Sequence, residues 1–436
     1  MNVSLLQGWL PVTMKVVAVL ALLAAVGWRD SRWRLRRLPV ALGVTVLLTV
    51  LVALGVLYLS GITDPLPFSL WVWAGVAIMA LTVLVVGWRG GRWWQRAAVP
   101  VAVLVAVATG ANVINQETGY YPTVGDAIGE LTDQPLPSQI TVDQAKSITG
   151  KTSTGRIVTV DIPTTASNFN HRQELVYLPP AWFRSASRPK LPVIEMIGGE
   201  FSAPDNWIRI GNAAQTADAY AKKHKGFAPV MVFVDPSGGF KVDTECANGP
   251  AGKAQDHLIK DVPPYVESTF GTATDPRKWG VAGWSMGGTC ALTMAVTHPG
   301  VFGHFLDISG DLGPNTGNKE QTIAKLYGGD AAAWAANDPM TVLAHHPKFP
   351  KGVTAVLMAG DQEARQTTQM KQQLEPALHK AGYSVHLTVL PGKHVWQFAA
   401  GAFAHDFAVL AQQVGTPGSR PTAATANKPE PAPSLP

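Results

Sequence analysis

The chain has 436 residues, of which 47% are hydrophobic and only 15% are charged. A soluble domain carries about 25% charged residues, so part of this chain is expected to face something other than water. Its two cysteines exclude a disulfide-dense scaffold and a cysteine-based zinc site, and no metal or cofactor is expected. The net charge of +5 includes two arginine clusters before residue 100 that interrupt long apolar runs, a pattern typical of membrane topology rather than of nucleic-acid binding.

Four apolar runs near the N-terminus are predicted to cross a membrane as helices. A helix rising 1.5 Å per residue needs about 20 apolar residues to span a hydrocarbon core of about 30 Å. The first run contains Lys15, and a cleaved signal peptide is the alternative for it. That alternative is disfavoured because the N-terminus is not basic and Arg29 follows where a small-residue cleavage site should be. The predicted spans are residues 9–28, 38–60, 65–88 and 97–114.

The arginine clusters Arg29–Arg37 and Arg89–Arg96 are expected to form cytoplasmic loops. One arginine at the bilayer centre costs about 2.5–3.5 kcal/mol, and loops rich in arginine stay on the cytoplasmic side. The N-terminus and everything after the fourth span would then lie outside the cytoplasm, in a multi-pass plasma-membrane protein. The second and third spans contain no carboxylate, histidine or Asn pair, so we expect the bilayer to be an anchoring partner and not a transport path.

Beyond the spans, residues 117–150 are expected to form a polar connector, 151–414 a folded domain, and 415–436 a disordered tail rich in Pro and Ala. The domain alternates strands and helices, which predicts an α/β fold with a mostly parallel sheet covered on both faces. Its first two strands are expected to be antiparallel. The predicted strands are 156–162, 173–178, 191–197, 229–234, 279–282, 302–308, 353–358 and 385–390, and the predicted helices are 213–223, 256–270, 286–296, 362–381 and 397–413.

One tight strand-to-helix turn has the pattern of a nucleophile elbow. Gly283-x-Ser285-x-Gly287 stands between a short apolar strand and a helix, where glycines leave room for a sharp turn that exposes the serine hydroxyl. The alternative is an ordinary glycine-rich turn. We interpret Ser285 as a candidate nucleophile.

A serine needs a histidine base and a carboxylate that orients the histidine, and on this fold they follow in the order Ser, acid, His. His394 comes directly after a late strand in a glycine-containing loop, with a surface or capping histidine as the alternative. The acid is ambiguous between Glu363, which has the usual spacing from the glycine that ends the preceding strand, and Asp361. The residue that is not the acid would be a carboxylate at a helix N-terminus.

The tetrahedral intermediate of acyl transfer needs two backbone N–H donors. Met286 follows the nucleophile and is the expected first donor, and Glu200, or failing that Phe201, is the expected second donor. A plain Gly-Gly turn is the alternative for the second position. Cys246 and Cys290 both lie near the predicted active-site end, so we hypothesise a disulfide, with two buried free thiols as the alternative.

Five motifs carry a family resemblance: Gly198-Gly199, Gly283-Trp-Ser285-Met-Gly287-Gly288, His298-Pro299-x-x-Phe302, Asp307-Ile-Ser309-Gly310 and Gly392-Lys-His394-Val-Trp396. Together they resemble the putative-esterase family of α/β-hydrolases, which includes esterase D and the antigen 85 mycolyltransferases. The resemblance covers roughly residues 155–412, and the N-terminal part resembles the four-span region of certain actinobacterial members. It implies a triad of Ser285, His394 and an acid at Glu363 or Asp361, with Met286 as an oxyanion donor. The strand before Gly198 usually ends in His-Gly or Asp-Gly in this family, which leaves the second donor open.

The sequence therefore predicts a membrane-anchored, extracytoplasmic serine hydrolase or acyltransferase that acts on an acyl ester, in the setting of cell-envelope lipids or acyl sugars. The rival hypothesis is a non-catalytic envelope-binding protein on the same scaffold. The motifs do not distinguish water from a sugar as acyl acceptor, and they leave the oligomeric state open.

Overall fold

The computed structural model describes residues 3–27, 29–59, 66–132, 134–240, 242–345 and 349–419. The chain divides into two compact units, one of residues Met1–Pro135 with His394–Gln397, the other of Leu136–Lys393 with Phe398–Pro436. Parts of four sequence predictions fall outside the described residues: the end of the first span at Trp28, the end of the second span at Ser60, the start of the third span at Pro65 and most of the C-terminal tail.

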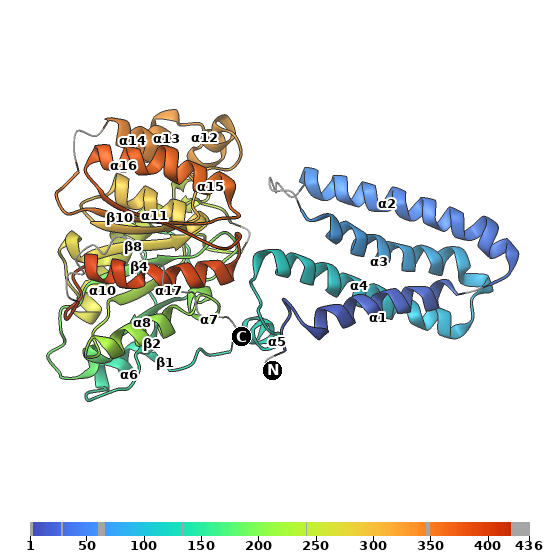
Figure 1. Ribbon diagram of the computed structural model, residues 1–436, viewed down its shortest axis with the longest axis horizontal. Coiled ribbons are helices and arrows are strands. Elements are labelled where there is room, and N and C mark those ends of the chain that lie inside the picture. Colours follow the sequence, from blue (N-terminus) through green and yellow to red (C-terminus); the bar gives the residue numbers. More distant parts are fainter. Residues whose placement is uncertain are drawn as a thin grey trace. The chain divides into compact units, whose positions relative to one another are not determined.

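The first unit is built on four helices that are long and apolar enough to cross a membrane. They pack in the pairs α1 with α4, α3 with α4, and α2 with α3. Alanines fill the contacts, including Ala21, Ala80 and Ala102, because small side chains let helix backbones approach closely in a lipid environment. The large apolar side chains point outward instead. The helices are α1 (Trp9–Val26), α2 (Leu38–Leu59), α3 (Phe68–Gly87) and α4 (Trp93–Thr118) (Figure 1).

The expectation that both arginine clusters form loops is wrong for part of each cluster. Trp33–Arg37 is a π-helical segment, η1, that continues directly into α2, and Arg96 lies within α4. The reason is that arginine is a good helix former and that the helices extend past their apolar cores. Trp33 is buried, and the guanidinium of Arg29 stacks over its ring at 4.1 Å. Only Trp88–Gly90 forms a short 3₁₀ turn, η2, between α3 and α4.

The second unit is an α/β domain around one nine-stranded sheet of order β1-β2-β3-β5-β4-β8-β9-β10-β11. Neighbouring strands are parallel except at β2–β3 and β3–β5, so the predicted antiparallel start and parallel remainder are confirmed. Its strands are β1 (Gln139–Thr141), β2 (Arg156–Val160), β3 (Glu174–Leu178), β4 (Val193–Ile197), β5 (Val230–Val234), β8 (Trp279–Trp284), β9 (His304–Ile308), β10 (Thr354–Gly360) and β11 (Ser384–Leu390); β6 (Asn248–Gly249) and β7 (Gly252–Lys253) form a separate hairpin.

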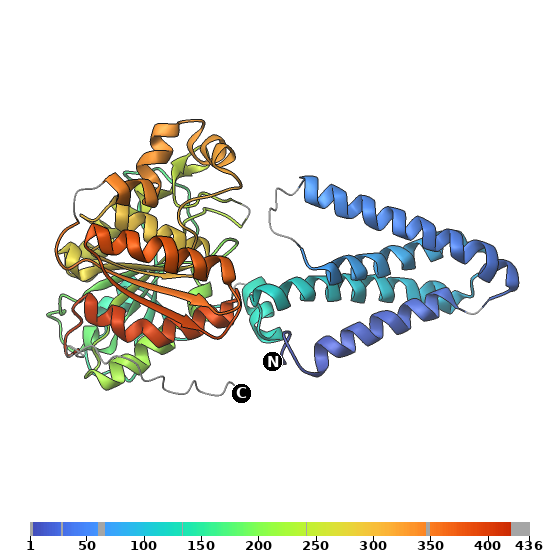
Figure 2. The same ribbon diagram turned by 45° about the horizontal axis from the view of Figure 1, so that its top comes forward.

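Helices cover both faces of this sheet (Figure 1, Figure 2). The larger apolar core lies between the sheet and α10, α11 and α16. On the other face Trp207 packs on Phe403, and Tyr220 packs on Phe407. The main helices are α7 (Asn206–Arg209), α8 (Ala213–Lys223), α10 (Val262–Phe270) with the preceding π turn η4 (His257–Asp261), α11 (Met286–Thr297), α15 (Ala364–Gln369), α16 (Glu375–Ala381) and α17 (Trp396–Gln413).

Two parts of this arrangement differ from the sequence prediction. The expected connector at 117–150 contains helix α5 (Val124–Leu131), strand β1 and helix α6 (Val142–Ser147), and β1 joins the sheet beside β2. Three short helices that are absent from the sequence prediction follow β9: α12 (Lys319–Tyr327), α13 (Ala331–Asn337) and α14 (Pro339–His345). The sequence does not reveal β1 because this strand has only three residues and gains its partner from the sheet, not from a local pattern.

Candidate active site

The turn that carries Ser285 lies near the middle of the sheet, between β8 and α11. Ser285 has φ 58° and ψ −123°, a conformation that is unfavourable for a residue with a side chain. Its N–H donates to the carbonyl of Ile308 at 2.9 Å, which fixes the turn against the end of β9. The predicted strand–Ser–helix arrangement is therefore present, with the serine held in a strained backbone as in a nucleophile elbow.

Both flanking glycines are required by close backbone contacts. A Cβ on Gly283 would lie 2.0 Å from the carbonyl oxygen of Gly287. A Cβ on Gly287 would lie 2.3 Å from the carbonyl oxygen of Ile197 and 2.5 Å from that of Gly198. The nucleophile turn is thus pressed against the end of β4, where the predicted oxyanion loop begins.

The loop from Gly198 to Ser202 and the first residue of α11 meet at this edge. Gly199 packs on Trp284, since an added Cβ would lie 3.1 Å from that ring, and Ser202 N–H closes a turn onto the carbonyl of Gly199 at 3.1 Å. Met286 is the first residue of α11, so its N–H has no acceptor within the helix. Glu200 is exposed in the middle of the turn.

The two candidate acids lie in different environments. Glu363 is buried, and its Oε2 accepts from the Ser309 hydroxyl at 2.7 Å and from the Gly360 N–H at 2.5 Å. Asp361 is exposed, and its Oδ1 accepts from the Gly392 N–H at 3.0 Å. Glu363 and the nucleophile turn therefore both contact the C-terminal end of β9. Ser285 bonds to Ile308, and Glu363 bonds to Ser309, the next residue.

The acid loop and the histidine loop are joined by main-chain hydrogen bonds. The N–H of Asp361 donates to the carbonyl of Leu390 at 2.8 Å, and the N–H of Gln362 donates to the carbonyl of Gly392 at 3.0 Å. His394 follows two residues later, just before α17 begins at Trp396. The segment His394–Gln397 groups with the first unit, so the second unit defines this loop up to Lys393.

Two buried carboxyl groups near the site, Asp307 and Glu245, have raised pKa values. Burial raises the pKa of Asp307 to about 8, against the effect of the Gly310 N–H, which donates to its Oδ1 at 2.8 Å. Burial also raises the pKa of Glu245 well above its usual value, and Asp243, Asp311 and Glu200 add to that effect. The charge of Glu363 contributes to the raised pKa of Asp307, and a pKa of about 8 favours the neutral form of Asp307 at neutral pH, which reduces charge repulsion between the two groups.

The two cysteines are joined beside the nucleophile helix. Cys246 and Cys290 have their sulfur atoms 2.10 Å apart and their Cα atoms 5.7 Å apart, the geometry of a disulfide. Cys290 is the fifth residue of α11, and Cys246 has a positive φ of 53° in the loop after β5. The bridge ties that loop to the helix that begins next to Ser285.

Sequence reasoning assigned no role to Ser309 or Asp307. Asp307 is the next-to-last residue of β9, and Ser309 directly follows the strand. Ser309 has φ 55° and donates its hydroxyl hydrogen to Glu363. The motif Asp307-Ile-Ser309-Gly310 stands at the end of a predicted strand, and this position could have indicated a role in the site, because functional residues gather at the carboxyl ends of parallel strands.

Comparison with known proteins identifies the family of the catalytic unit. The family model "Putative esterase" matches residues 169–410, which is more than half of the chain. The chain belongs to the putative-esterase family. It is thus an enzyme of the esterase type, and the sequence resemblance is confirmed.

Named relatives of this esterase include proteins with and without a described activity. An uncharacterized protein of Corynebacterium glutamicum is 30% identical over 367 residues, which cover 81% of this chain and 83% of that protein. An S-formylglutathione hydrolase of Paracoccus denitrificans is 28% identical over 206 residues, covering 43% of this chain and 69% of the relative. An S-formylglutathione hydrolase structure from Agrobacterium tumefaciens is 17% identical with a TM-score of 0.49, covering 61% of this chain and 98% of that one.

Proposed function

We propose that this esterase is a membrane-anchored acyl hydrolase or acyltransferase that works through an acyl-serine. The Ser285 oxygen attacks the ester carbonyl carbon while the His394 imidazole takes its proton, and Glu363 orients and stabilises the imidazolium. The C–O bond to the leaving group then breaks, and His394 gives that alkoxide its proton. A water or an acceptor hydroxyl repeats the sequence on the acyl-serine and releases the acyl group.

The observation that carries the proposal is the backbone of Ser285. Strained φ and ψ values persist only where the surroundings enforce them, and here two glycines without room for a Cβ enforce the turn. Glu363 is the favoured acid because it is buried and hydrogen-bonded to Ser309, whereas Asp361 is exposed. A buried carboxylate keeps its interaction with an imidazolium strong, because solvent screens it less.

The apolar surface beside the predicted oxyanion turn favours an apolar acyl group. Phe201 and Phe240 are 40% and 61% exposed, and their ring centroids lie 5.3 Å apart. Exposed aromatic side chains at the predicted oxyanion turn offer a place for an acyl chain. Together with a membrane anchor, this supports envelope lipids or acyl sugars as the substrate class.

The arginine clusters support one side of the membrane for the catalytic unit. They lie where α1 connects to α2 and where α3 connects to α4, which is the end of the helices opposite to the C-terminal end of α4, and arginine-rich ends stay cytoplasmic. The catalytic unit is therefore proposed to lie outside the cytoplasm, as is the N-terminus.

Labelling with a fluorophosphonate tests the proposal directly. We expect the wild-type protein to be labelled and Ser285→Ala to be unlabelled, with hydrolysis of p-nitrophenyl esters lost in the same variant. Rates should rise with acyl chain length if the aromatic pair binds the chain. Equal labelling of the two proteins would refute the acyl-serine, and an unlabelled wild type would favour an envelope-binding protein. A membrane-impermeant probe that labels intact cells would support the extracytoplasmic location, and labelling only after lysis would refute it.

A further inference from the structure

A buried cluster of charged side chains lies just before and at the start of β3. Because β3 runs antiparallel to β5, with Leu175 opposite Phe233, the residues before β3 lie beside those that follow β5. That position is the edge at which the parallel strands end, the same edge that carries the Ser285 turn. The cluster is formed by His171, Arg172, Glu174, Asp235, His257 and Asp261.

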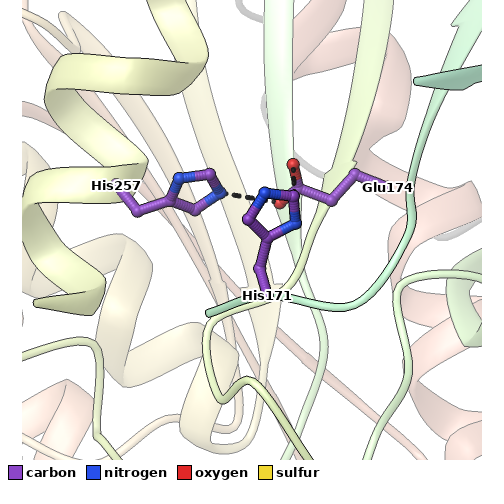
Figure 3. Close-up of side chains that lie close together, drawn as sticks. All are labelled: His171, Glu174 and His257. Carbon is purple, nitrogen blue, oxygen red and sulfur yellow. Dashed lines mark hydrogen bonds and ion pairs between the residues drawn. The ribbon is translucent and has the colours of Figure 1, made fainter. Parts of the chain in front are cut away.

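Three members of the cluster resemble a metal site at first sight (Figure 3). Ligand atoms of His171, Glu174 and His257 lie within 4.8 Å of one another. However, His171 Nδ1 lies 2.6 Å from the carbonyl oxygen of Arg172, and its Nε2 lies 2.9 Å from that of Ile162. Carbonyl oxygens only accept hydrogen bonds, so both ring nitrogens are donors and neither offers a lone pair to a cation.

His171 is therefore best described as an imidazolium beside a carboxylate. Burial acts to lower the pKa of His171, but the charge of Glu174, 3.7 Å away, and the two carbonyls raise it above its ordinary value. The cluster is an ion-pair network, and its role depends on the groups that it holds in position.

Glu174 fixes the main chain at the end of β5. Its Oε1 accepts from the Asp235 N–H at 2.9 Å and faces the His257 Nε2 at 3.0 Å, and all three residues have no exposed surface. Figure 3 shows His257 directed at this carboxylate. A buried carboxylate with such partners holds its neighbours in one geometry, since losing either partner would leave a polar atom unsatisfied.

Asp235 in turn holds Arg172 at both ends of its carboxylate. Arg172 Nε donates to Oδ2 at 3.0 Å, Nη2 donates to Oδ1 at 2.7 Å, and the Arg172 N–H donates to Oδ2 at 2.7 Å. Burial acts to raise the pKa of Asp235, but the hydrogen bonds and charge of Arg172 hold it below its usual value. This paired contact fixes the plane of the guanidinium.

The fixed guanidinium reaches the oxyanion turn. Its Nη2 also donates to the carbonyl of Ser202 at 2.7 Å, and Ser202 closes the turn that starts at Gly199. Within that turn Phe201 has φ 63°, a conformation that needs support from its surroundings. Arg172 supports this conformation through its hydrogen bond to the carbonyl of Ser202, the residue after Phe201.

We propose that Arg172 is a positioning residue for the oxyanion turn Gly199–Ser202. By holding the Ser202 carbonyl, it keeps the N–H of Glu200 or Phe201 directed at the oxygen that becomes negative when Ser285 attacks. The inference rests on the proposed acyl-serine function. It implies that Arg172 acts on the transition state and not on substrate binding, because the donor is used only when the oxyanion forms.

The test compares Arg172→Gln with Arg188→Gln in the full-length, detergent-solubilised protein. Arg188 also bonds main-chain carbonyls, those of Trp182, Ser185, Lys146 and Ile148, but it precedes β4 and so lies at the opposite edge of the sheet. Loss of one oxyanion donor costs about a hundredfold or more in kcat, so a displaced donor should cost about ten- to a hundredfold.

For Arg172→Gln we expect that fall in kcat for a p-nitrophenyl ester, with KM within about threefold. A trifluoromethyl ketone inhibitor, whose adduct places an oxygen in the oxyanion hole, should bind more weakly by a similar factor. Arg188→Gln should lower the melting temperature and leave kcat unchanged. If Arg172→Gln does not fold, Arg172→Lys and Asp235→Asn must show the same loss in kcat with KM preserved.

A folded Arg172→Gln with wild-type kcat and inhibitor affinity would overturn the positioning role. If Ser285→Ala is inactive in that experiment, the acyl-serine function stands and only the positioning inference fails. A wild type that is neither labelled nor active shows that the proposed function itself is wrong.

Discussion

Exchanging the two candidate acids for their amides separates their roles. In Glu363→Gln the amide oxygen can keep both hydrogen bonds that Oε2 now accepts, from Ser309 at 2.7 Å and from Gly360 at 2.5 Å. The amide nitrogen then replaces the second carboxylate oxygen, so a donor stands where the imidazole needs an acceptor. An amide at the acid position of a serine triad lowers kcat by about 10⁴ through the wrong tautomer. That factor corresponds to about 5 kcal/mol of transition-state stabilisation.

The matched control is Asp361→Asn, which retains an acceptor for the Gly392 N–H and lies at the surface. We expect its kcat to stay within about twofold and both melting temperatures to stay within about 3 °C of wild type. Steady-state hydrolysis of a p-nitrophenyl ester and a thermal melt measure both. A large loss in Asp361→Asn together with a nearly active Glu363→Gln would show that the acid has been assigned to the wrong residue.

Three further changes test the surroundings of the nucleophile. Gly287→Ala would place a Cβ 2.3 Å from the Ile197 carbonyl oxygen, and we expect kcat to fall about a hundredfold because the turn must shift; an unchanged rate would refute this. Replacing Cys246 and Cys290 by alanine opens a bridge between residues 44 apart, which should cost about 4 kcal/mol and lower the melting temperature by about 10 °C, and a smaller change than about 2 °C would contradict it. Since burial raises the pKa of Asp307 to about 8, the unfolded chain loses this proton from about pH 4 upward while the folded protein keeps it to about pH 8. Stability from this group therefore falls as pH rises, and the melting-temperature advantage of Asp307→Asn should grow from pH 5 to pH 8; a constant difference would contradict it.

Much of the catalytic unit could be predicted from local patterns. The predicted helix 213–223 coincides with α8, and the strands were located to within about two residues because each is a short apolar run between turns. The nucleophile turn could also be predicted, since its glycines and serine lie within five consecutive residues. Strand order was not predicted, because it depends on pairings between distant segments.

The contact of Arg172 with the oxyanion turn could not be predicted from local sequence patterns. Arg172 and Asp235 are separated by 63 residues, and no spacing within either segment indicates that they pair. Their common feature is that each stands next to a strand end at the same edge, which becomes visible only once β3 is known to run antiparallel to β5. The choice between Glu363 and Asp361 likewise depends on burial, which follows from packing and not from spacing.

The short strand β1 bears on how the catalytic unit can be produced without its membrane helices. A protein that begins where the family match begins, at residue 169, lacks β1 and β2 and leaves β3 at the edge of the sheet. All five residues of β3 are buried in the intact chain, so this truncation exposes a mostly apolar strand with unpaired N–H and C=O groups. Such an edge recruits strands from other molecules, and the product should accumulate as inclusion bodies. A truncation that starts at Leu136, the first residue of the second unit, lacks the membrane helices but retains β1 and β2, and it should yield soluble protein.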